Sequence, residues 1–292
     1  MISGLTLRTG YFDDKAAFLG LASLLEDTFG IDITHVDQLG GPDPTSMPFA
    51  YFDEAGRCVA NFTAFCLPLI VDGRSVRAAG YQSGAVRPEF RGQGLYRDLM
   101  RRAFGWSGEQ GFERGLLLTD KPSLYQPFGF RSVAQHCFRG RVQSEPSGTF
   151  RVLSIDRAED VALIQASLAE RLPVSEHFAV AGHAIEFLLN ACFDPAIRLG
   201  HMVNADAVIA WRDDGEIPAL LDVVGRDMPS VSQIADALGI SEGMLDVCFP
   251  IDRLPWQAEP QTYEGACVLM ARGDWPALFD GRLFMLSPMA EF

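Results

Sequence analysis

Hydrophobic and polar positions in the first part of the chain predict one strand, one helix and then a group of strands. Apolar residues alternate with polar ones over residues 5–12, as expected for a half-buried strand. Asp13 and Asp14 then precede apolar residues at helical spacing up to Gly30, where the helix would end. Three more strands are predicted at residues 49–52, 58–70 and 75–86, with a hairpin turn at Asp72-Gly73.

The last of these strands leads into a glycine-rich turn and an amphipathic helix. Gly80 and Gly84 predict a β-bulge within the strand, which would separate it from its neighbour and open a slot. Gly92 and Gly94 follow, and a helix is predicted over residues 92–108. The first amides of a helix lack intrahelical partners and attract anions, and glycine lets a ligand approach the main chain. The pattern indicates a phosphate-binding turn; the alternative is an ordinary glycine-rich helix start with solvated arginines.

Two known glycine-rich loops do not fit this turn. A P-loop requires a lysine and a hydroxyl residue after its second glycine, where this chain has Leu95 and Tyr96. A dinucleotide-binding fingerprint requires a third glycine or an alanine, where this chain has Arg97. The run Arg91-Gly92-Gln93-Gly94-Leu95 instead resembles the acetyl-coenzyme A loop of the GNAT family of acyltransferases.

A second segment carries the same resemblance. An apolar strand is predicted at residues 115–119, and it is followed by Tyr125-Gln126-Pro127-Phe128-Gly129-Phe130. This order is similar to the segment with a Tyr and a Gly-Phe pair that follows the cofactor helix and strand of GNAT domains. Because both motifs occur in the family's order, together they are more specific than either alone.

The resemblance implies a fold and a set of site residues. The fold would be α+β, a mixed, mostly antiparallel sheet flanked by helices, in two tandem GNAT-like domains of which the second is degenerate. Acetyl-coenzyme A (acetyl-CoA) would be the acyl donor, and Tyr125 would protonate the departing thiolate. The residues expected to bind the cofactor are Gly84, Ala85, Val86, Arg91, Gly92, Gln93, Gly94, Leu95, Tyr96, Arg97, Asp120 and Lys121. Further candidates for holding its nucleotide phosphates are Arg87, Arg101 and Arg102.

The second half of the chain faintly repeats the first. A strand pattern and a helix pattern follow Pro146-Ser147-Gly148, and residues 224–229 lack the two-glycine turn, so no pyrophosphate site is expected there. We predict a GNAT domain at residues 1–145 and a degenerate one at 146–292. The arrangement is similar to proteins of the enhanced-intracellular-survival type, without their third, sterol-carrier-like domain. In those proteins the terminal carboxylate is the general base, which implies that role for Phe292 here; a frayed terminus is the alternative.

Composition and charge limit the kinds of ligand, metal site and cellular location that we expect. The net charge is −14, and residues 146–292 hold 22 acidic against 9 basic side chains. This charge repels nucleic acid and anionic membranes and favours a cationic small molecule such as a polyamine or aminoglycoside; the alternative is that it serves solubility alone. The six cysteines form no C-x-x-C pair and the five histidines are scattered, so neither a metal nor a disulfide is expected. The chain has neither a bilayer-length apolar run nor a signal-peptide pattern, so we expect a cytoplasmic protein.

The sequence thus predicts an N-acetyltransferase that moves the acetyl group of acetyl-CoA directly to a primary amine of a small cationic molecule. One alternative is a non-catalytic acyl-CoA sensor or interaction protein. Another is an enzyme that acetylates protein N-termini or lysines, which would need an open acceptor groove. We expect the loop at residues 40–48 and the second domain to border the acceptor. The sequence leaves the oligomeric state open, a homo-oligomer included.

Overall fold

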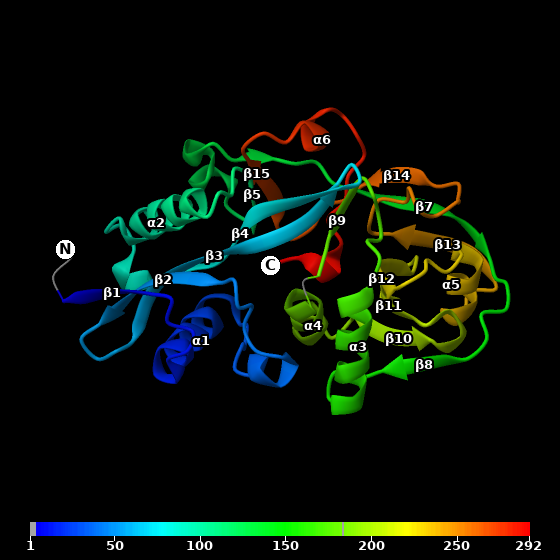
Figure 1. The fold of residues 1–292 in the computed structure, drawn as a ribbon, viewed down its shortest axis with the longest axis horizontal. Helices are drawn as coiled ribbons and strands as arrows, with labels where there is room; N and C mark the ends of the chain where they lie inside the picture. The colour runs from blue at the N-terminus through cyan, green and yellow to red at the C-terminus, as the bar shows by residue number, and fades with distance from the viewer. Residues whose placement is uncertain (1–3, 183) are drawn as a thin grey trace.

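The computed structural model describes residues 4–182 and 184–292, which form two β-sheets side by side (Figure 1). The first sheet has the strand order β1-β2-β3-β4-β5-β15-β6, and β9 also pairs with β3. Its strands are β1 (Leu5–Thr9), β2 (Met47–Asp53), β3 (Cys58–Val71), β4 (Arg74–Val86), β5 (Gly115–Thr119), β6 (Arg131–Ser132), β9 (Phe178–Val180) and β15 (Val268–Arg272). Most pairs are antiparallel, whereas β4 and β5 pair in parallel.

The second sheet has the order β14-β7-β13-β12-β11-β10-β8. Its strands are β7 (His136–Gln143), β8 (Phe150–Leu153), β10 (Arg198–Met202), β11 (Ala207–Arg212), β12 (Ala219–Gly225), β13 (Glu242–Val247) and β14 (Glu259–Thr262). Here too most pairs are antiparallel and one, β12 with β13, is parallel. The second sheet therefore repeats the arrangement of β3, β4 and β5 in its own β11, β12 and β13.

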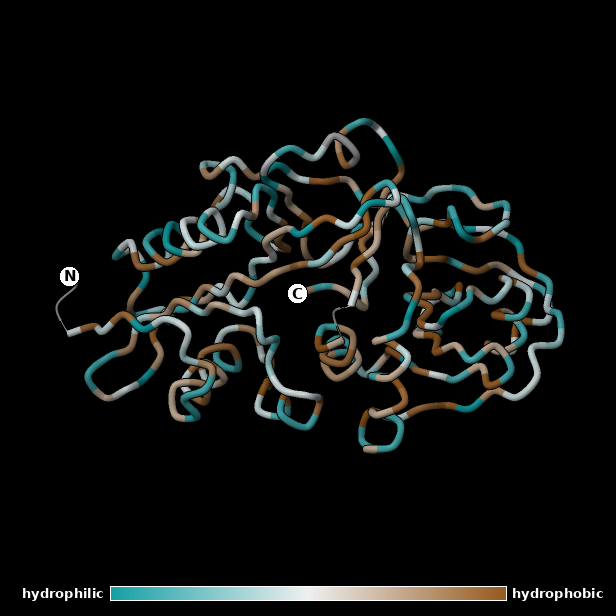
Figure 2. Tube along the Cα trace, in the orientation of Figure 1, coloured by the Kyte–Doolittle hydropathy of each residue, from teal (hydrophilic) through white to brown (hydrophobic). Residues whose placement is uncertain are grey.

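Helices flank both sheets. The α-helices are α1 (Lys15–Phe29), α2 (Leu95–Glu109), α3 (Ala158–Glu170), α4 (Ala184–Phe193), α5 (Val231–Ala237) and α6 (Pro276–Phe279). The described residues also form short 3-10 helices, which are η1 (Val36–Leu39), η2 (Pro88–Phe90), η3 (Pro122–Leu124), η4 (Gln126–Phe128), η5 (Val203–Ala205) and η6 (Pro288–Ala290). α1 and α2 lie on opposite faces of the first sheet (Figure 1). Figure 2 shows a largely hydrophobic α4, in contrast to the hydrophilic outer turns of α2.

Local sequence signals account for the ends of α1. The Asp14 carboxylate accepts hydrogen bonds from the amides of Ala16 (3.0 Å) and Ala17 (3.1 Å), which would otherwise lack partners at the helix start. Gly30 ends the helix in the left-handed conformation, with φ of 70°. Both helix ends are confirmed where the sequence predicts them.

The bulge in β4 is confirmed at Gly84 and is wrong for Gly80. The register between β3 and β4 shifts opposite Ser83, whose φ is 55°, next to Gly84. Gly80 instead continues the regular ladder opposite Phe65, and the Phe65 ring occupies the space that a Cβ on Gly80 would need. Gly80 is therefore required for packing, because any larger residue would displace a buried aromatic ring.

The two sheets exchange strands across residue 145. β7 precedes that residue yet pairs with β13 and β14 in the second sheet. β15 comes near the end of the chain yet pairs with β5 and β6 in the first sheet. The predicted division into residues 1–145 and 146–292 therefore does not coincide with the two sheets, and separate folding of the two halves stays a prediction.

Candidate active site

A cleft of about 1210 Å³ brings the two halves of the chain together. Its walls come from α1, the end of β4, the turn before α2, the segment after β5, α4 and the C-terminal residues. The predicted site residues that line it are Gly84, Ala85, Val86, Arg91, Gly92, Gly94, Leu95, Tyr96, Arg97, Asp120, Lys121, Tyr125 and Phe292. Gln93 is exposed and its side chain donates to the Glu89 carbonyl at 3.4 Å, so this side chain is not among the residues that line the cleft.

A slot opens beside β4 because two parallel strands diverge. β4 pairs with β5 only over Ala79–Tyr81 among the described residues, and the bulge follows. Buried Asn61 fixes the bulge, since its Nδ2 donates to the Ser83 carbonyl at 2.9 Å and its Oδ1 accepts from the Tyr11 hydroxyl at 2.7 Å. Residues 84–86 line the cleft at this bulge, where main-chain groups outside the regular ladder are available to a ligand.

The glycine turn presents the start of α2 to the same cleft. Gly92 and Gly94 have φ of 75° and 81°, and a Cβ at either residue would meet nothing within 4 Å. The left-handed backbone, rather than crowding, therefore requires glycine at these positions. Gly94 is the N-cap of α2, and no side chain caps the helix there. The first amides of α2 thus combine unpaired donors with the positive end of the helix dipole, an arrangement that suits a phosphate.

The corresponding helix of the second sheet differs in having a side-chain cap at its start. α5 lies between the parallel strands β12 and β13, as α2 lies between β4 and β5. Ser230 caps α5 by accepting from the amide of Gln233, and the Gln233 side chain accepts from the Ser230 amide. This capping box occupies the amides of the N-cap and N3 residues, whereas no side chain caps α2, so the start of α2 offers a ligand more free donors.

The arginines around the turn divide into two groups. Arg87 is buried and pairs with Asp27 at 2.5 Å, while Arg102 pairs with Asp98 at 2.6 Å one helical turn away. These two side chains form ion pairs within the protein and are not among the residues that line the cleft. The arginines that line the cleft are Arg91, Arg97 and Arg101.

Two tyrosine hydroxyls meet at the junction of the slot and the turn. Tyr125 is 7% exposed, and its hydroxyl oxygen lies 2.5 Å from that of Tyr96. Burial raises the pKa of Tyr125, and hydrogen bonds from Tyr96 and Thr119 partly offset this. Burial also raises the pKa of Tyr96 well above its ordinary value. The Tyr96 hydroxyl occupies the space that a Cβ on Gly84 would fill, so the bulge glycine makes the pair possible.

The C-terminal segment, Met285–Phe292, lies between the two sheets and ends in the cleft (Figure 1). The Leu286 amide donates to buried Gln135 at 2.9 Å, and the Ser287 hydroxyl donates to the Leu221 carbonyl at 2.9 Å. These bonds attach the segment to Gln135, just before β7, and to β12 of the second sheet.

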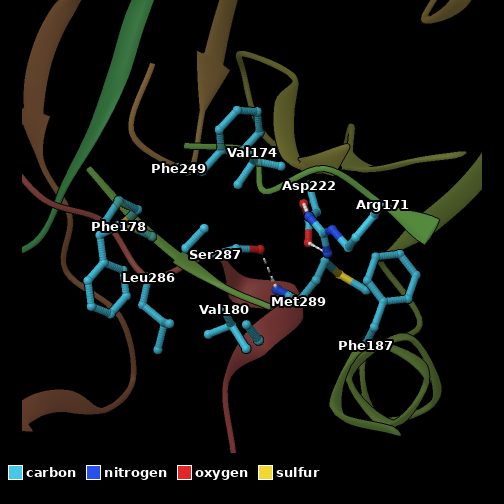
Figure 3. Close-up of a pocket in the computed structure, with 13 residues that line it drawn as sticks. Arg171, Val174, Phe178, Val180, Phe187, Asp222, Phe249, Leu286, Ser287 and Met289 are labelled. Carbon is cyan, nitrogen blue, oxygen red and sulfur yellow. Dashed lines mark hydrogen bonds and ion pairs between the residues drawn. The ribbon is translucent and has the colours of Figure 1, made fainter. Parts of the chain in front are cut away.

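A buried ion pair packs beneath this segment. Arg171 and Asp222 lie 2.7 Å apart and line a small cavity of about 20 Å³. Figure 3 shows the pair beside Met289. The side chains of the pair are 9% and 3% exposed. Losing either partner would leave a charge buried without compensation, so both side chains are needed for a stable core beneath the segment.

Glu291 is a titratable group that the sequence analysis missed. Burial raises its pKa from an ordinary 4.5 to about 7, with Arg212 acting in the opposite direction. The Asn190 side chain in α4 donates to the Glu291 carbonyl at 2.8 Å and holds the residue at the cleft. The Phe292 ring packs edge-on against buried Phe65, with centroids 5.1 Å apart. A carboxyl that titrates near neutrality beside a deep cleft is a general-base candidate.

Further residues of the cleft that sequence reasoning missed include members of α4 and α1. Glu186 and Asn190 line the cleft from α4, and an apolar face of α1 lines it from the opposite side. The only available signal was the acidity of the second half, which does not single out a residue. Within residues 4–182 and 184–292, no cluster of histidine, cysteine or acidic residues is arranged to hold a metal. The helices in these residues are too short or too polar to cross a bilayer.

Comparison with known proteins identifies the fold and its first unit. Residues 24–133 match the family model described as an acetyltransferase (GNAT) domain. These residues are therefore similar to GNAT acetyltransferase domains. Over 111 residues the chain is 34% identical to YhbS of Escherichia coli (strain K12), an uncharacterized N-acetyltransferase. That match covers 38% of this chain and 62% of YhbS, so the chain spans less than two thirds of this relative.

The GNAT fold extends over nearly the whole chain. A probable N-acyltransferase from Enterococcus faecalis V583 superposes with a TM-score of 0.59 at 14% identity, covering 92% of this chain and 72% of that protein. Eis1 from Mycobacterium abscessus superposes with a TM-score of 0.59 at 15% identity, covering 92% and 73%. The predicted fold class, a tandem of mixed, mostly antiparallel GNAT-like units, is confirmed.

Proposed function

We propose that this GNAT protein is an N-acetyltransferase that transfers the acetyl group of acetyl-CoA to a primary amine of a small cationic molecule. One observation carries the proposal: the uncapped start of α2 and the buried hydroxyl of Tyr125 face the same cleft. The match of residues 24–133 to the GNAT model supports the same reaction class.

Charge is segregated within the cleft in a way that suits these two substrates. The basic side chains lie around the glycine turn and after β5, where the diphosphate and nucleotide of acetyl-CoA would bind; they are Arg91, Arg97, Arg101 and Lys121. Glu186 and Glu291 lie on the side formed by α4 and the C-terminal segment. An ammonium group would be attracted to that second side. Lys121 pairs with Asp120 at 3.3 Å on the exposed rim.

The chemistry requires one nucleophile, one base and one acid. The neutral amine attacks the thioester carbonyl, a C–N bond forms, and the C–S bond breaks. The phenol of Tyr125 gives its proton to the thiolate, and the hydrogen bonds from Tyr96 and Thr119 stabilise the phenolate left behind. Main-chain amides of the bulged strand near Gly84 are available to polarise the carbonyl.

The proton lost by the amine goes to a carboxylate at the C-terminal segment. The Glu291 side chain suits this role because its pKa of about 7 lets it accept a proton near neutrality. The terminal carboxylate of Phe292 is the second candidate, as the family resemblance implies. A short extension after Phe292 and the substitution Glu291→Gln distinguish them. If Glu291 is the base, the extension leaves turnover within about twofold and Glu291→Gln does not; the opposite pattern assigns Phe292.

Thiol release with a panel of amines tests the proposal as a whole. We expect calorimetry to show acetyl-CoA binding, and we expect at least one amine to raise thiol release far above the background without amine. Binding without such release would instead identify the acyl-CoA sensor. Release that occurs only with a protein or peptide acceptor would identify a protein acetyltransferase.

A further inference from the structure

We propose that the acceptor is a monoamine carried on an apolar body, an arylalkylamine or a medium-chain alkylamine, rather than a polyamine; this inference rests on the proposed function and names its substrate class. The acceptor side of the cleft is built mainly of aliphatic and aromatic side chains. Carboxylate side chains are few on this side of the cleft.

One apolar wall comes from α1. Phe18, Leu21, Leu25 and Phe29 recur at helical spacing along a single face and line the cleft. Leu21 and Leu25 also reach the core beneath the first sheet, whereas Phe29 is 51% exposed. Aliphatic residues after α1 extend this wall; they are Ile31, Ile33 and Val36.

The facing apolar wall comes from α4, in the other half of the chain. Phe187, Leu188 and Ala191 use one face of this helix to pack in the core of the second sheet. Its other face, formed by Ile185, Leu189 and Phe193, lines the cleft, and Phe193 is 39% exposed. The hydrophobic faces of two helices thus meet across one opening, and an apolar ligand body between them would displace water from both.

The polar groups on this side lie at a few specific places. Glu186 and Glu291 line the cleft together with Asn190, which hydrogen-bonds to main-chain carbonyls of both. A primary amine bound near these carboxylates would place the rest of its molecule between α1 and α4. A second ammonium further along the same chain would lie among aliphatic and aromatic side chains and lose its hydration without a partner.

Asp43 is a further carboxylate that lines the cleft, and a dicationic acceptor would need such a group for its second ammonium. It lines the cleft beside Pro42, and its two oxygens accept from the amide (2.8 Å) and the hydroxyl (2.7 Å) of Thr45. The carboxylate is thus committed to the conformation of the loop before β2. The test therefore compares monoamines with diamines of equal length, because only a second usable carboxylate would favour the diamine.

The experiment measures kcat/KM for linear amines with the full chain and saturating acetyl-CoA. From propylamine to octylamine we expect kcat/KM to rise about threefold to fourfold per methylene until the cleft is filled. We expect 1,6-diaminohexane to be at least about tenfold poorer than hexylamine. A flat dependence on length, or a diamine as good as the monoamine, overturns the inference while leaving an N-acetyltransferase in place. Failure of every amine to release thiol overturns the function and the inference together.

Matched variants assign the effect to the two walls. Phe29→Ser and Phe193→Ser remove exposed side chains from α1 and α4, so both should fold, and we expect each to flatten the dependence on chain length. Leu19→Ser is the control, because Leu19 is 46% exposed on α1 but is not among the residues lining the cleft. It should keep the unaltered dependence. Equal slopes in all three variants would place the amine elsewhere.

Discussion

The hydroxyl oxygens of Tyr96 and Tyr125 lie 2.5 Å apart, although the two residues belong to different structural elements. Tyr96 belongs to the first turn of α2, and Tyr125 lies between the 3-10 helices η3 and η4. Their rings are edge-to-face, with centroids 6.4 Å apart. Tyr96 is the second residue of α2, so it directly follows the turn that would bind the diphosphate. Its hydrogen bond therefore links that turn to Tyr125, the proposed acid.

Replacing the acid itself is the first prediction. Tyr125→Phe keeps the buried ring and removes the proton that the thiolate would receive, so we expect kcat to fall by about 10²-fold or more. The KM for acetyl-CoA should change little, because the ring keeps its contacts. Stopped assays at saturating amine measure both constants. A kcat within about threefold of the unaltered protein would remove Tyr125 from the chemistry.

Tyr96 is predicted to be a positioning residue that acts through Tyr125. Its hydroxyl is hydrogen-bonded to that of Tyr125 and lowers the pKa of that residue, so Tyr96→Phe should raise the pKa of Tyr125 further. Because an acid works only while protonated, the decline of kcat at alkaline pH should move to higher pH, and kcat itself should fall. Tyr51→Phe is the control: its hydroxyl bonds to Asp98 at 2.7 Å on the same helix, outside the residues that line the cleft. Identical pH profiles for the two variants would contradict the assignment.

The glycine turn gives a prediction about affinity. Gly94 has a φ of 81°, so Gly94→Ala strains the backbone at the start of α2, and we expect the Kd for acetyl-CoA to rise about tenfold. Gly105→Ala is a matched control inside the same helix, where a Cβ would meet nothing within 4 Å. That change should stabilise the helix by ~1 kcal/mol and leave the Kd unaltered. Calorimetric titration of both variants decides the point; equal Kd values would place the diphosphate away from the turn.

Glu291 gives a prediction about pH. The rate should increase as pH rises through about 7, since the carboxyl must lose its proton to act as a base. Glu291→Gln should abolish that step and lower kcat by about 10²-fold. Glu242→Gln, at an exposed position on β13, should change neither property. A step near pH 7 that persists in the Glu291→Gln variant would have to come from another group.

The same carboxyl should make the protein less stable at neutral pH than in mild acid. Its pKa rises from 4.5 to about 7 on folding, so the folded state holds the proton more tightly. The free energy of unfolding should therefore decrease between pH 4.5 and 7, by ~3 kcal/mol at most from this group, and then level off. Glu291→Gln should raise the melting temperature at pH 8. An unchanged melting temperature at pH 8 would show that burying the Glu291 carboxylate does not destabilise the protein.

The parts of the fold that were predictable from sequence depend on local signals. Asp14 and Gly30 mark the ends of α1, and Asp72-Gly73 marks a hairpin whose residues have φ of 49° and 70°. The two glycines before α2 likewise form the left-handed turn that their sequence suggests. In each case residues a few positions apart determine the conformation, so no knowledge of distant contacts is needed.

The missed parts depend on contacts between distant residues. β15 is a five-residue apolar strand that pairs with β5, from the other half of the chain, and nothing in its own sequence specifies that partner. α4 was missed for a related reason, since its apolar residues surround the helix and serve a core and a cleft at once. Glu186 and Glu291 belong to no motif, and only the packing of the C-terminal segment against α4 brings them to the cleft.

β15 lies near the end of the chain, so the first sheet can be completed only after most of the chain has been synthesised. A nascent chain that has left the ribosome only through residue 145 already contains the glycine turn, but the edge of β5 still lacks the partner that covers it. Such an intermediate would expose a hydrophobic strand edge to other chains and would lack both Glu186 and Glu291. Expression of residues 1–145 alone should consequently yield aggregated protein. Co-expression of residues 146–292 as a separate chain should restore a soluble, folded protein.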